Sequence, residues 1–121
     1  MKNSLLIILC FALTACNPFA DGLTLKLAKP SPNHSLEARL VYREINDPYH
    51  EQWVIQISTP KAQLSGWADV VIEFPIDYKI EGLNWKNDEE LEIEYLKGSS
   101  ELSLVDFRSP FHGVTITLKQ K

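Results

Sequence analysis

The side chains best suited to metal chemistry are three histidines, His34, His50 and His112. They stand far apart in the sequence, and none has a second metal ligand at a recognised spacing. The segment HEQW at 50–53 lacks the second histidine of a zinc-binding helix and lies in a strand-like pattern. The histidines therefore predict no metal site.

The densest group of carboxylates is formed by Glu89, Glu90, Glu92 and Glu94. Glu92 and Glu94 alternate with apolar residues, which places both on the solvent face of one strand, whereas the other two fall in a turn. Glycosidase chemistry needs two carboxyl groups that flank a cleft. The chain also lacks a G-x-S-x-G elbow and a glycine-rich phosphate loop. We therefore predict no catalytic residues and expect the glutamates to be solvated.

Two cysteines remain, Cys10 and Cys16, and their surroundings are unusual. Cys10 lies within an unbroken apolar run from Leu5 to Leu13, which follows the positively charged Lys2. As a helix this run would span about 13 Å, less than half of the hydrocarbon core of a bilayer, which is about 30 Å thick. A short apolar run between a positive charge and small residues is typical of a secretory signal peptide.

The end of that run, Leu13-Thr14-Ala15-Cys16, resembles the lipobox of bacterial lipoprotein precursors. The resemblance implies that the Cys16 thiol carries a diacylglycerol, that the signal peptide is cut between Ala15 and Cys16, and that the new amino terminus is acylated as well. An ordinary secretion signal cut at another alanine and an uncleaved anchor are the alternatives. Asn17 resembles the residue that follows the cysteine in lipoproteins sent to the outer membrane of Gram-negative bacteria.

This interpretation divides the chain into a signal peptide at 1–15, a lipidated amino terminus and tether at 16–22, and one domain at 23–121. Cys16 becomes the only cysteine of the mature chain, so we expect neither a disulfide nor a catalytic thiol. Two or three acyl chains anchor a protein stably, and the extended tether reaches about 20 Å. We expect a domain held close to a membrane of the cell envelope, on the periplasmic side of the outer membrane in a Gram-negative cell.

The composition fits one globular domain and excludes some partners. Of the 121 residues, 45% are hydrophobic and 23% are charged, and the formal net charge is −4. No cluster of lysines and arginines indicates nucleic-acid binding. Because an acidic protein is weakly repelled by anionic headgroups, we expect membrane attachment through the acyl chains and not through a basic face. No cofactor other than the covalent lipid is expected.

The domain has a strand-like pattern along most of its length. Alternation of apolar and polar residues predicts antiparallel strands with one buried and one solvent-exposed face. The alternating segments are 23–27, 36–43, 53–58, 69–74, 91–95, 102–104 and 114–118.

A further strand is predicted at 78–85, where the alternation changes phase. A β-bulge at Glu81–Gly82 would return the apolar residues on both sides of it to the core, and glycine tolerates a bulge. The segment KNDEE after Trp85 is a turn suited to a hairpin. The sequence thus predicts an all-β domain, a small antiparallel β-sandwich or open barrel of about eight strands.

Aromatic residues are enriched in two of the predicted loops, at 46–50 and 108–113. Aromatic side chains on loops of a rigid sheet are plausible contacts for a partner, although those in these two loops could instead fold back and close the ends of the core. The candidate partner contacts are Tyr49, His50, Trp67, Phe111 and His112.

The leading hypothesis is a membrane-anchored lipoprotein whose small β-domain binds another, unidentified protein, as an inhibitor, an immunity factor or an assembly accessory. One alternative is a small-ligand-binding protein or hydrolase, which a deep pocket lined by His50, His112 or Asp106 would favour. A structural spacer in the envelope is another alternative.

The mass of the mature amino-terminal peptide tests the lipid anchor. We expect a peptide that begins at Cys16 and carries a diacylglycerol and an amide-linked acyl chain. Cys16→Ala should leave the protein uncleaved or release it from the membrane fraction, because the lipid acceptor is gone. Cys10→Ala is the matched control and should be processed normally, since Cys10 leaves with the signal peptide. An unmodified amino terminus at another position would contradict the interpretation.

Overall fold

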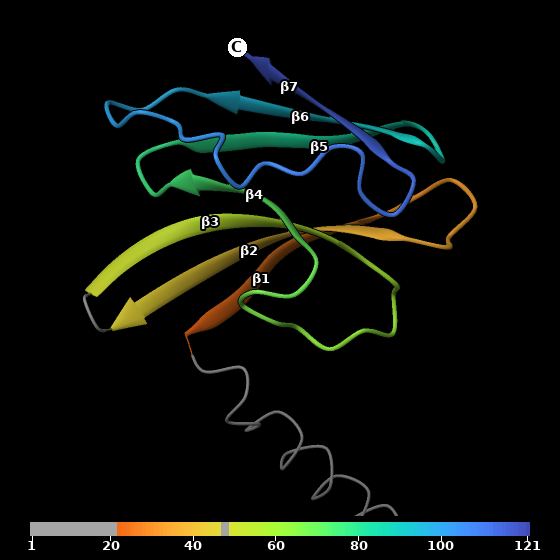
Figure 1. The fold of residues 1–121 in the computed structure, drawn as a ribbon, viewed down its shortest axis with the longest axis horizontal. Coiled ribbons are helices and arrows are strands. Elements are labelled where there is room, and N and C mark those ends of the chain that lie inside the picture. The colour runs from red at the N-terminus through yellow and green to blue at the C-terminus, as the bar shows by residue number, and fades with distance from the viewer. Residues whose placement is uncertain (1–21, 47–48) are drawn as a thin grey trace, which may run out of the picture.

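The computed structural model describes residues 22–46 and 49–121, and it confirms an all-β fold. Within these residues lie seven strands, which form two sheets packed face to face (Figure 1). In the same part of the chain there is no helix of the length and apolarity needed to cross a membrane. The predicted signal peptide, Cys16 and most of the tether lie outside the described residues.

The first sheet is an antiparallel meander in the order β1-β2-β3-β4. Its strands are β1 (Leu23–Pro30), β2 (Glu37–Asn46), β3 (Tyr49–Ser58) and β4 (Val70–Pro75). Strands that follow each other in the chain are paired, as short connections favour. The longer segment between β3 and β4, residues 59–69, is called the β3–β4 loop.

The second sheet has the order β5-β6-β7, with β5 (Lys79–Asn87), β6 (Glu90–Leu96) and β7 (Thr115–Gln120). β5 and β6 form the predicted hairpin, and a register shift between Ile80 and Gly82 confirms the predicted bulge. β6 and β7 are parallel, so the expectation of antiparallel pairing throughout is wrong. The segment 97–114, called the β6–β7 loop, returns the chain to the end where β6 begins, and Glu90 therefore pairs with Thr115.

The predicted strand at 102–104 is absent, which leaves seven strands among the described residues in place of about eight. Leu102 packs against the core, but Leu104 is 52% exposed, so the two leucines do not share a buried face. The β6–β7 loop instead lies along β4, where the Arg108 N–H donates to the Val71 carbonyl at 2.8 Å. Covering the edge of a sheet in this way protects it from pairing with other chains.

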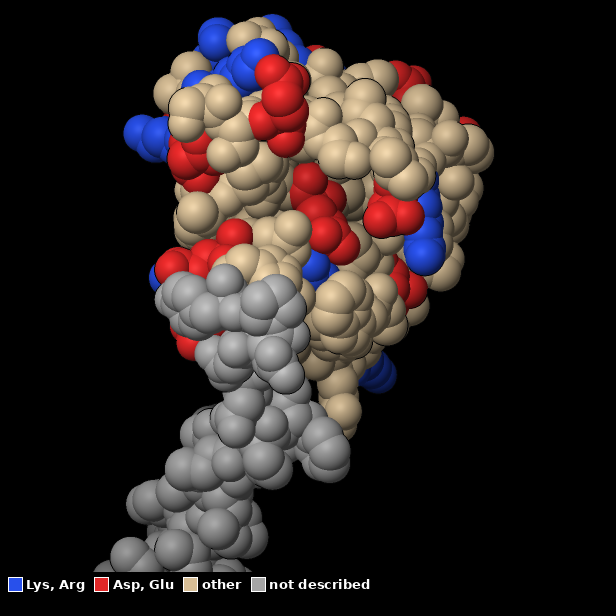
Figure 2. Space-filling model, turned by 60° about the vertical axis from the view of Figure 1, so that its left-hand side comes forward, with Lys and Arg blue, Asp and Glu red and all other residues tan. Residues whose placement is uncertain are grey.

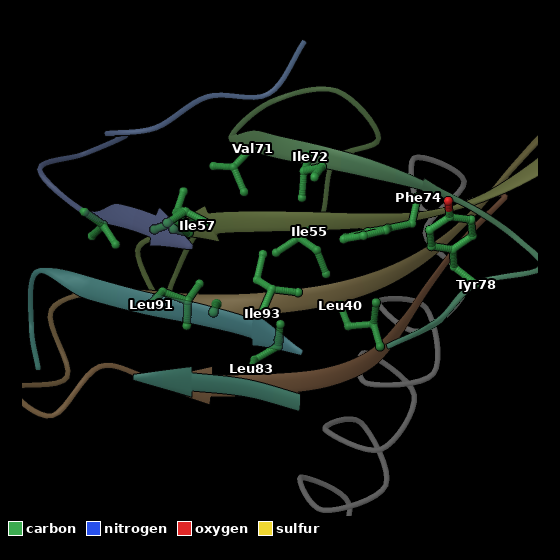
Figure 3. Packing of buried hydrophobic residues seen from close by; sticks show 13 residues of the cluster. Leu40, Ile55, Ile57, Val71, Ile72, Phe74, Tyr78, Leu83, Leu91 and Ile93 are labelled. Atoms are coloured by element: carbon green, nitrogen blue, oxygen red, sulfur yellow. The ribbon is translucent and has the colours of Figure 1, made fainter. Parts of the chain in front are cut away.

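The main core fills the space between the two sheets (Figure 3). Each large apolar side chain buried there contributes about 1.5–3 kcal/mol, so this cluster is the principal source of stability. Aromatic rings extend the core at one end, with ring centroids 5.2–5.9 Å apart among Phe74, Tyr78 and Tyr95. The buried members include Leu40, Ile55, Ile57, Ile72, Phe74, Tyr78, Leu83, Leu91, Ile93 and Ile116.

The outer face of the first sheet is also covered, so the prediction that this face meets solvent is wrong. Val41, Val54 and Val70 form a second buried cluster, against which Leu23 and Leu64 pack. The β3–β4 loop lies across this face, and its carbonyls accept hydrogen bonds that replace lost water. Four polar residues of this face are at most 5% exposed, namely Arg39, Arg43, Gln56 and Ser58.

A bulge in β1 lets this strand contribute to both clusters. The register with β2 shifts between Leu25 and Leu27. Leu23 packs against the second cluster, Leu27 packs against the main core, and Leu25 is left 47% exposed. Simple alternation placed the three leucines on one buried face, and this is wrong because the extra residue turns the following side chains to the opposite face.

Candidate functional site

The candidate site lies at the end of the sandwich where β2 and β4 end and β3 begins. Figure 2 turns this side toward the viewer and shows acidic side chains in the middle of the face, with uncharged surface and some basic atoms beside them. A small pocket of about 190 Å³, called the acidic pocket, lies between β3, β4 and the β6–β7 loop. It is lined by Gln52, Glu73, Pro75, Glu101, Ser103, Asp106 and Phe107.

The Arg43 guanidinium connects this face to the β3–β4 loop. Its Nη2 lies 3.0 Å from Glu73 Oε2 and also donates to Gln52, and its Nη1 donates to the Gly66 carbonyl at 2.7 Å. The ring of Trp67 covers the guanidinium, with its centroid 4.2 Å from Cζ. Arginine suits this place because its planar fork donates in several directions and stacks on an aromatic ring.

Sequence reasoning did not single out Arg43, Glu73 or the acidic pocket. Alternation correctly places Arg43 and Glu73 on the same face of the sheet, but it cannot show that a loop covers that face. The sequence does contain one indication that a loop covers the face, namely the long segment between β3 and β4, which contains the apolar residues Leu64 and Trp67. A connection of that length and composition can cover a sheet, and the charged residues beneath it then need partners.

Two of the predicted partner contacts border this face. Trp67 is 66% exposed, although one face of its ring lies on Arg43. His50 lines a shallow depression of about 480 Å³ that shares Gln52 and Pro75 with the acidic pocket. Tyr49 is the first residue of β3, but its side chain lies outside what the structure describes.

The other two predicted contacts lie elsewhere. Phe111 packs against the main core, in agreement with the alternative that it folds back. His112 is exposed, and its Nε2 lies 3.1 Å from Asp69 Oδ1, just before β4 begins. The rings of Phe111 and His112 have centroids 4.2 Å apart and contact each other. The structure therefore does not gather the predicted contacts into one site.

Among the residues that the structure describes, no group of three or more histidine, cysteine, aspartate or glutamate side chains is arranged to hold a metal ion. His50 and Asp106 line different depressions, and His112 pairs with Asp69, so the deep histidine-lined pocket of the hydrolase hypothesis is not formed by these residues.

The acidic strand β6 has the polar outer face that alternation predicts. Leu91 and Ile93 point into the core, and the intervening Glu92 and Glu94 remain partly exposed. Their carboxylates lie 3.5 Å from Lys86 Nζ and 3.6 Å from Lys121 Nζ, respectively. The two lysines are about half exposed, whereas the carboxylate side chains are 18% and 19% exposed, so the glutamates are less solvated than alternation predicts and the pairs partly neutralise the face.

A hydrogen-bonded aspartate secures the start of the β6–β7 loop. Asp77 Oδ2 accepts the N–H of Ser100 at 3.0 Å and both the N–H and the hydroxyl of Ser99 at 2.6 and 2.9 Å. The Ser100 N–H, followed by the Ser99 hydroxyl, lowers the pKa of Asp77. Gly98 allows this close approach, because a Cβ at that position would lie 2.5 Å from the Asp77 carboxyl group.

The β6–β7 loop also presents apolar surface beside the acidic pocket. Leu104 is 52% exposed and Val105 is 87% exposed. They stand between Ser103 and Asp106, both of which line the pocket. Exposed apolar side chains beside charged groups are a common feature of surfaces that bind proteins.

Comparison with known proteins adds no family. No family model matches the chain, and no curated protein or solved structure is significantly similar to it.

Replacing Arg43 by lysine should loosen the β3–β4 loop. Lysine keeps the charge but has one nitrogen in place of the two Nη atoms that reach Glu73 and the loop carbonyl, so we expect the free energy of unfolding to fall by about 1–3 kcal/mol. Urea denaturation measures this loss, and trypsin should cut faster after Lys61 in the loop under native conditions. The control is Arg108→Lys at an exposed site, with an expected change within about 0.5 kcal/mol. A variant at position 43 as stable as the wild type would contradict this role.

Asp77→Asn should reduce the acid sensitivity of the domain. Because the folded pKa of Asp77 lies below its ordinary value of 3.8, its stabilising contribution is complete above that value and is lost as the pH falls through the lower folded pKa. The wild type should therefore lose more stability than the variant as the pH falls from 3.8 through the lower folded pKa, as measured by urea midpoints. Glu89→Gln, at an exposed residue of the β5–β6 turn, should behave like the wild type. Equal pH dependence in all three proteins would exclude the effect.

Proposed function

We propose that this protein is a lipid-anchored lipoprotein of the cell envelope whose β-sandwich binds another protein. The segment Leu13-Thr14-Ala15-Cys16 supports the anchor, and the described strands all begin after Cys16. Acyl chains on Cys16 hold the start of the domain within about 20 Å of the bilayer, the length of the extended tether. In a Gram-negative cell the proposed location is the outer membrane, with the domain in the periplasm.

The observation that carries the binding proposal is the exposed Leu104–Val105 tip of the β6–β7 loop. The loop is held at its start by the Asp77 hydrogen bonds and further along by the bond from Arg108 to the β4 carbonyl. Apolar side chains on a loop secured in this way are presented with little loss of conformational entropy on binding. Leu104 and Val105 therefore have the properties expected of residues that contact a partner protein.

The acidic pocket beside the tip favours a partner with basic side chains. Glu101 and Asp106 line it together with Glu73, whose carboxylate is paired with Arg43, and the formal net charge of the chain is −4. Complementary charge raises the rate of association and suppresses binding of the wrong partner. Among the candidate contacts, His50 borders this surface most directly through the shared residues Gln52 and Pro75.

The dimensions of the pocket favour a protein partner over a small ligand. Its volume of about 190 Å³ is below the roughly 300–1,000 Å³ typical of small-molecule sites. The neighbouring depression beside His50 is wider but shallow. The hydrolase, the small-ligand-binding protein and the structural spacer are kept as alternatives to this proposal.

Photocrosslinking in intact cells tests the binding surface. A photoreactive amino acid at Val105 should capture a specific protein, because this side chain is 87% exposed and can be replaced without disturbing the core. The same group at Thr117, exposed on the outer face of β7, is the matched control and should not capture that protein. With the purified partner, Val105→Glu should weaken binding by about fivefold or more, the usual cost of losing an interface anchor. Capture of lipid alone, or equal capture from both positions, would refute the proposal.

A further inference from the structure

Trp67 differs from the other two tryptophans of the chain in its exposure. Trp53 and Trp85 are half-buried, and their indole N–H groups donate to the Tyr78 and Lys29 carbonyls at 3.1 and 2.9 Å. Trp67 is 66% exposed, and its indole N–H has no hydrogen-bond partner among residues 22–46 and 49–121. A large apolar ring with a free donor group suits the boundary between an apolar and an aqueous phase.

The indole of Trp67 is held in place while it remains exposed. One face of the ring lies on the buried Arg43 guanidinium. The main chain around it is fixed by Ser65 Oγ, which accepts the N–H groups of Trp67 and Ala68 at 3.2 and 3.0 Å. The ring is therefore presented by a secured turn, and contact with another phase would cost little further ordering.

Trp67 lies close to the place where the chain enters the domain. Leu23, the first residue of β1, lines the same groove of about 460 Å³ as Leu64 and Trp67. A Cβ on Gly66 would lie only 3.4 Å from the Leu23 side chain. Figure 1 shows the start of β1 and the β3–β4 loop on one side of the molecule, and the C-terminus on the opposite side.

The tether between Cys16 and Leu23 is short, so it keeps this side of the domain close to the bilayer. The tether from Cys16 reaches about 20 Å when extended, so the anchored end of the sandwich stays near the headgroups. The β3–β4 loop contains two charged residues, Lys61 and Asp69, and the aspartate is paired with His112. The loop therefore has no excess negative charge that would be repelled by anionic lipid.

We propose that Trp67 inserts into the headgroup region of the bilayer that holds the anchor and thereby fixes the orientation of the domain. This inference rests on the proposed acylation of Cys16, because one indole alone binds a membrane weakly. Tryptophan concentrates at membrane–water interfaces, where its ring is buried and its N–H remains hydrated. Once the acyl chains hold the domain at the surface, a weak contact becomes effectively intramolecular and is therefore occupied.

Quenching of tryptophan fluorescence by lipid-borne bromine tests this contact. Purified acylated protein is placed in phosphatidylcholine vesicles whose chains carry bromine near the headgroup. Total emission should fall by up to about a third, because one of three indoles lies at the depth of the quencher. Trp67→Phe should abolish the loss, and phenylalanine keeps an aromatic ring over Arg43 so that the fold is retained. Unchanged emission of the wild type in brominated vesicles would overturn the proposal.

A displaced tryptophan provides the matched control. Thr117 is exposed on the second sheet, so Trp67→Phe combined with Thr117→Trp should emit without quenching by the lipid. Equal quenching at the two positions would show that the domain has no fixed orientation. If Trp67 were protected from aqueous iodide but not quenched by bromine, a second copy or residues 17–21 would cover it. Either result would overturn the proposal.

The proposed acylation of Cys16 and the proposed contact of Trp67 with the bilayer can be refuted separately. An acylated Cys16 without quenching of Trp67 would refute the contact and leave the lipid anchor in place. If mass spectrometry showed no acylation, the anchor would be wrong, and a protein purified with Cys16 at its amino terminus could be coupled through that thiol to a maleimide lipid to supply the tether. The same bromine measurement would then decide whether Trp67 meets the bilayer.

Discussion

A guanidinium removed from water must be paired, and much of the first sheet is organised around this requirement at Arg43. The side chain is 3% exposed and reaches Glu73 on β4, Gln52 on β3 and the Gly66 carbonyl of the β3–β4 loop. Loss of Glu73 would leave a buried charge uncompensated, which is far more costly than loss of an exposed ion pair, whereas loss of Gln52 or of the Gly66 carbonyl would leave a buried donor without its acceptor. The loop is thereby held against the sheet, and Trp67 is held at its surface.

Coverage by that loop explains how a small domain without a disulfide among its described residues buries both faces of one sheet. The valines of the second cluster stay dry because Leu64 and Leu23 lie over them. The bulge in β1 is needed for this arrangement, since it lets Leu23 face outward while Leu27 faces the main core. The second sheet has no such cover on its charged outer face and buries its apolar residues on the inner side alone.

The two surfaces proposed to act on other molecules are both loops secured by a few polar contacts. The β3–β4 loop depends on Arg43, and the β6–β7 loop depends on Asp77 and on the bond from Arg108 to β4. The two loops present their exposed residues at different places, since Trp67 lies beside the start of β1 and Val105 lies beside the acidic pocket. If the first meets lipid, the domain presents the second in a constant direction to a protein in the same compartment.

The features that the sequence determined by itself are local ones. The bulge at Ile80–Gly82 and the hairpin turn after it follow from phase and turn residues within one strand pair, and the proposed signal around Cys16 is a linear pattern that needs no fold. Tertiary structure alone decided the parallel pairing of β6 with β7, the exposure of Leu104 and the burial of Arg43. The physical reason is that alternation shows which side chains share a face, whereas whether that face meets water depends on segments distant in the chain.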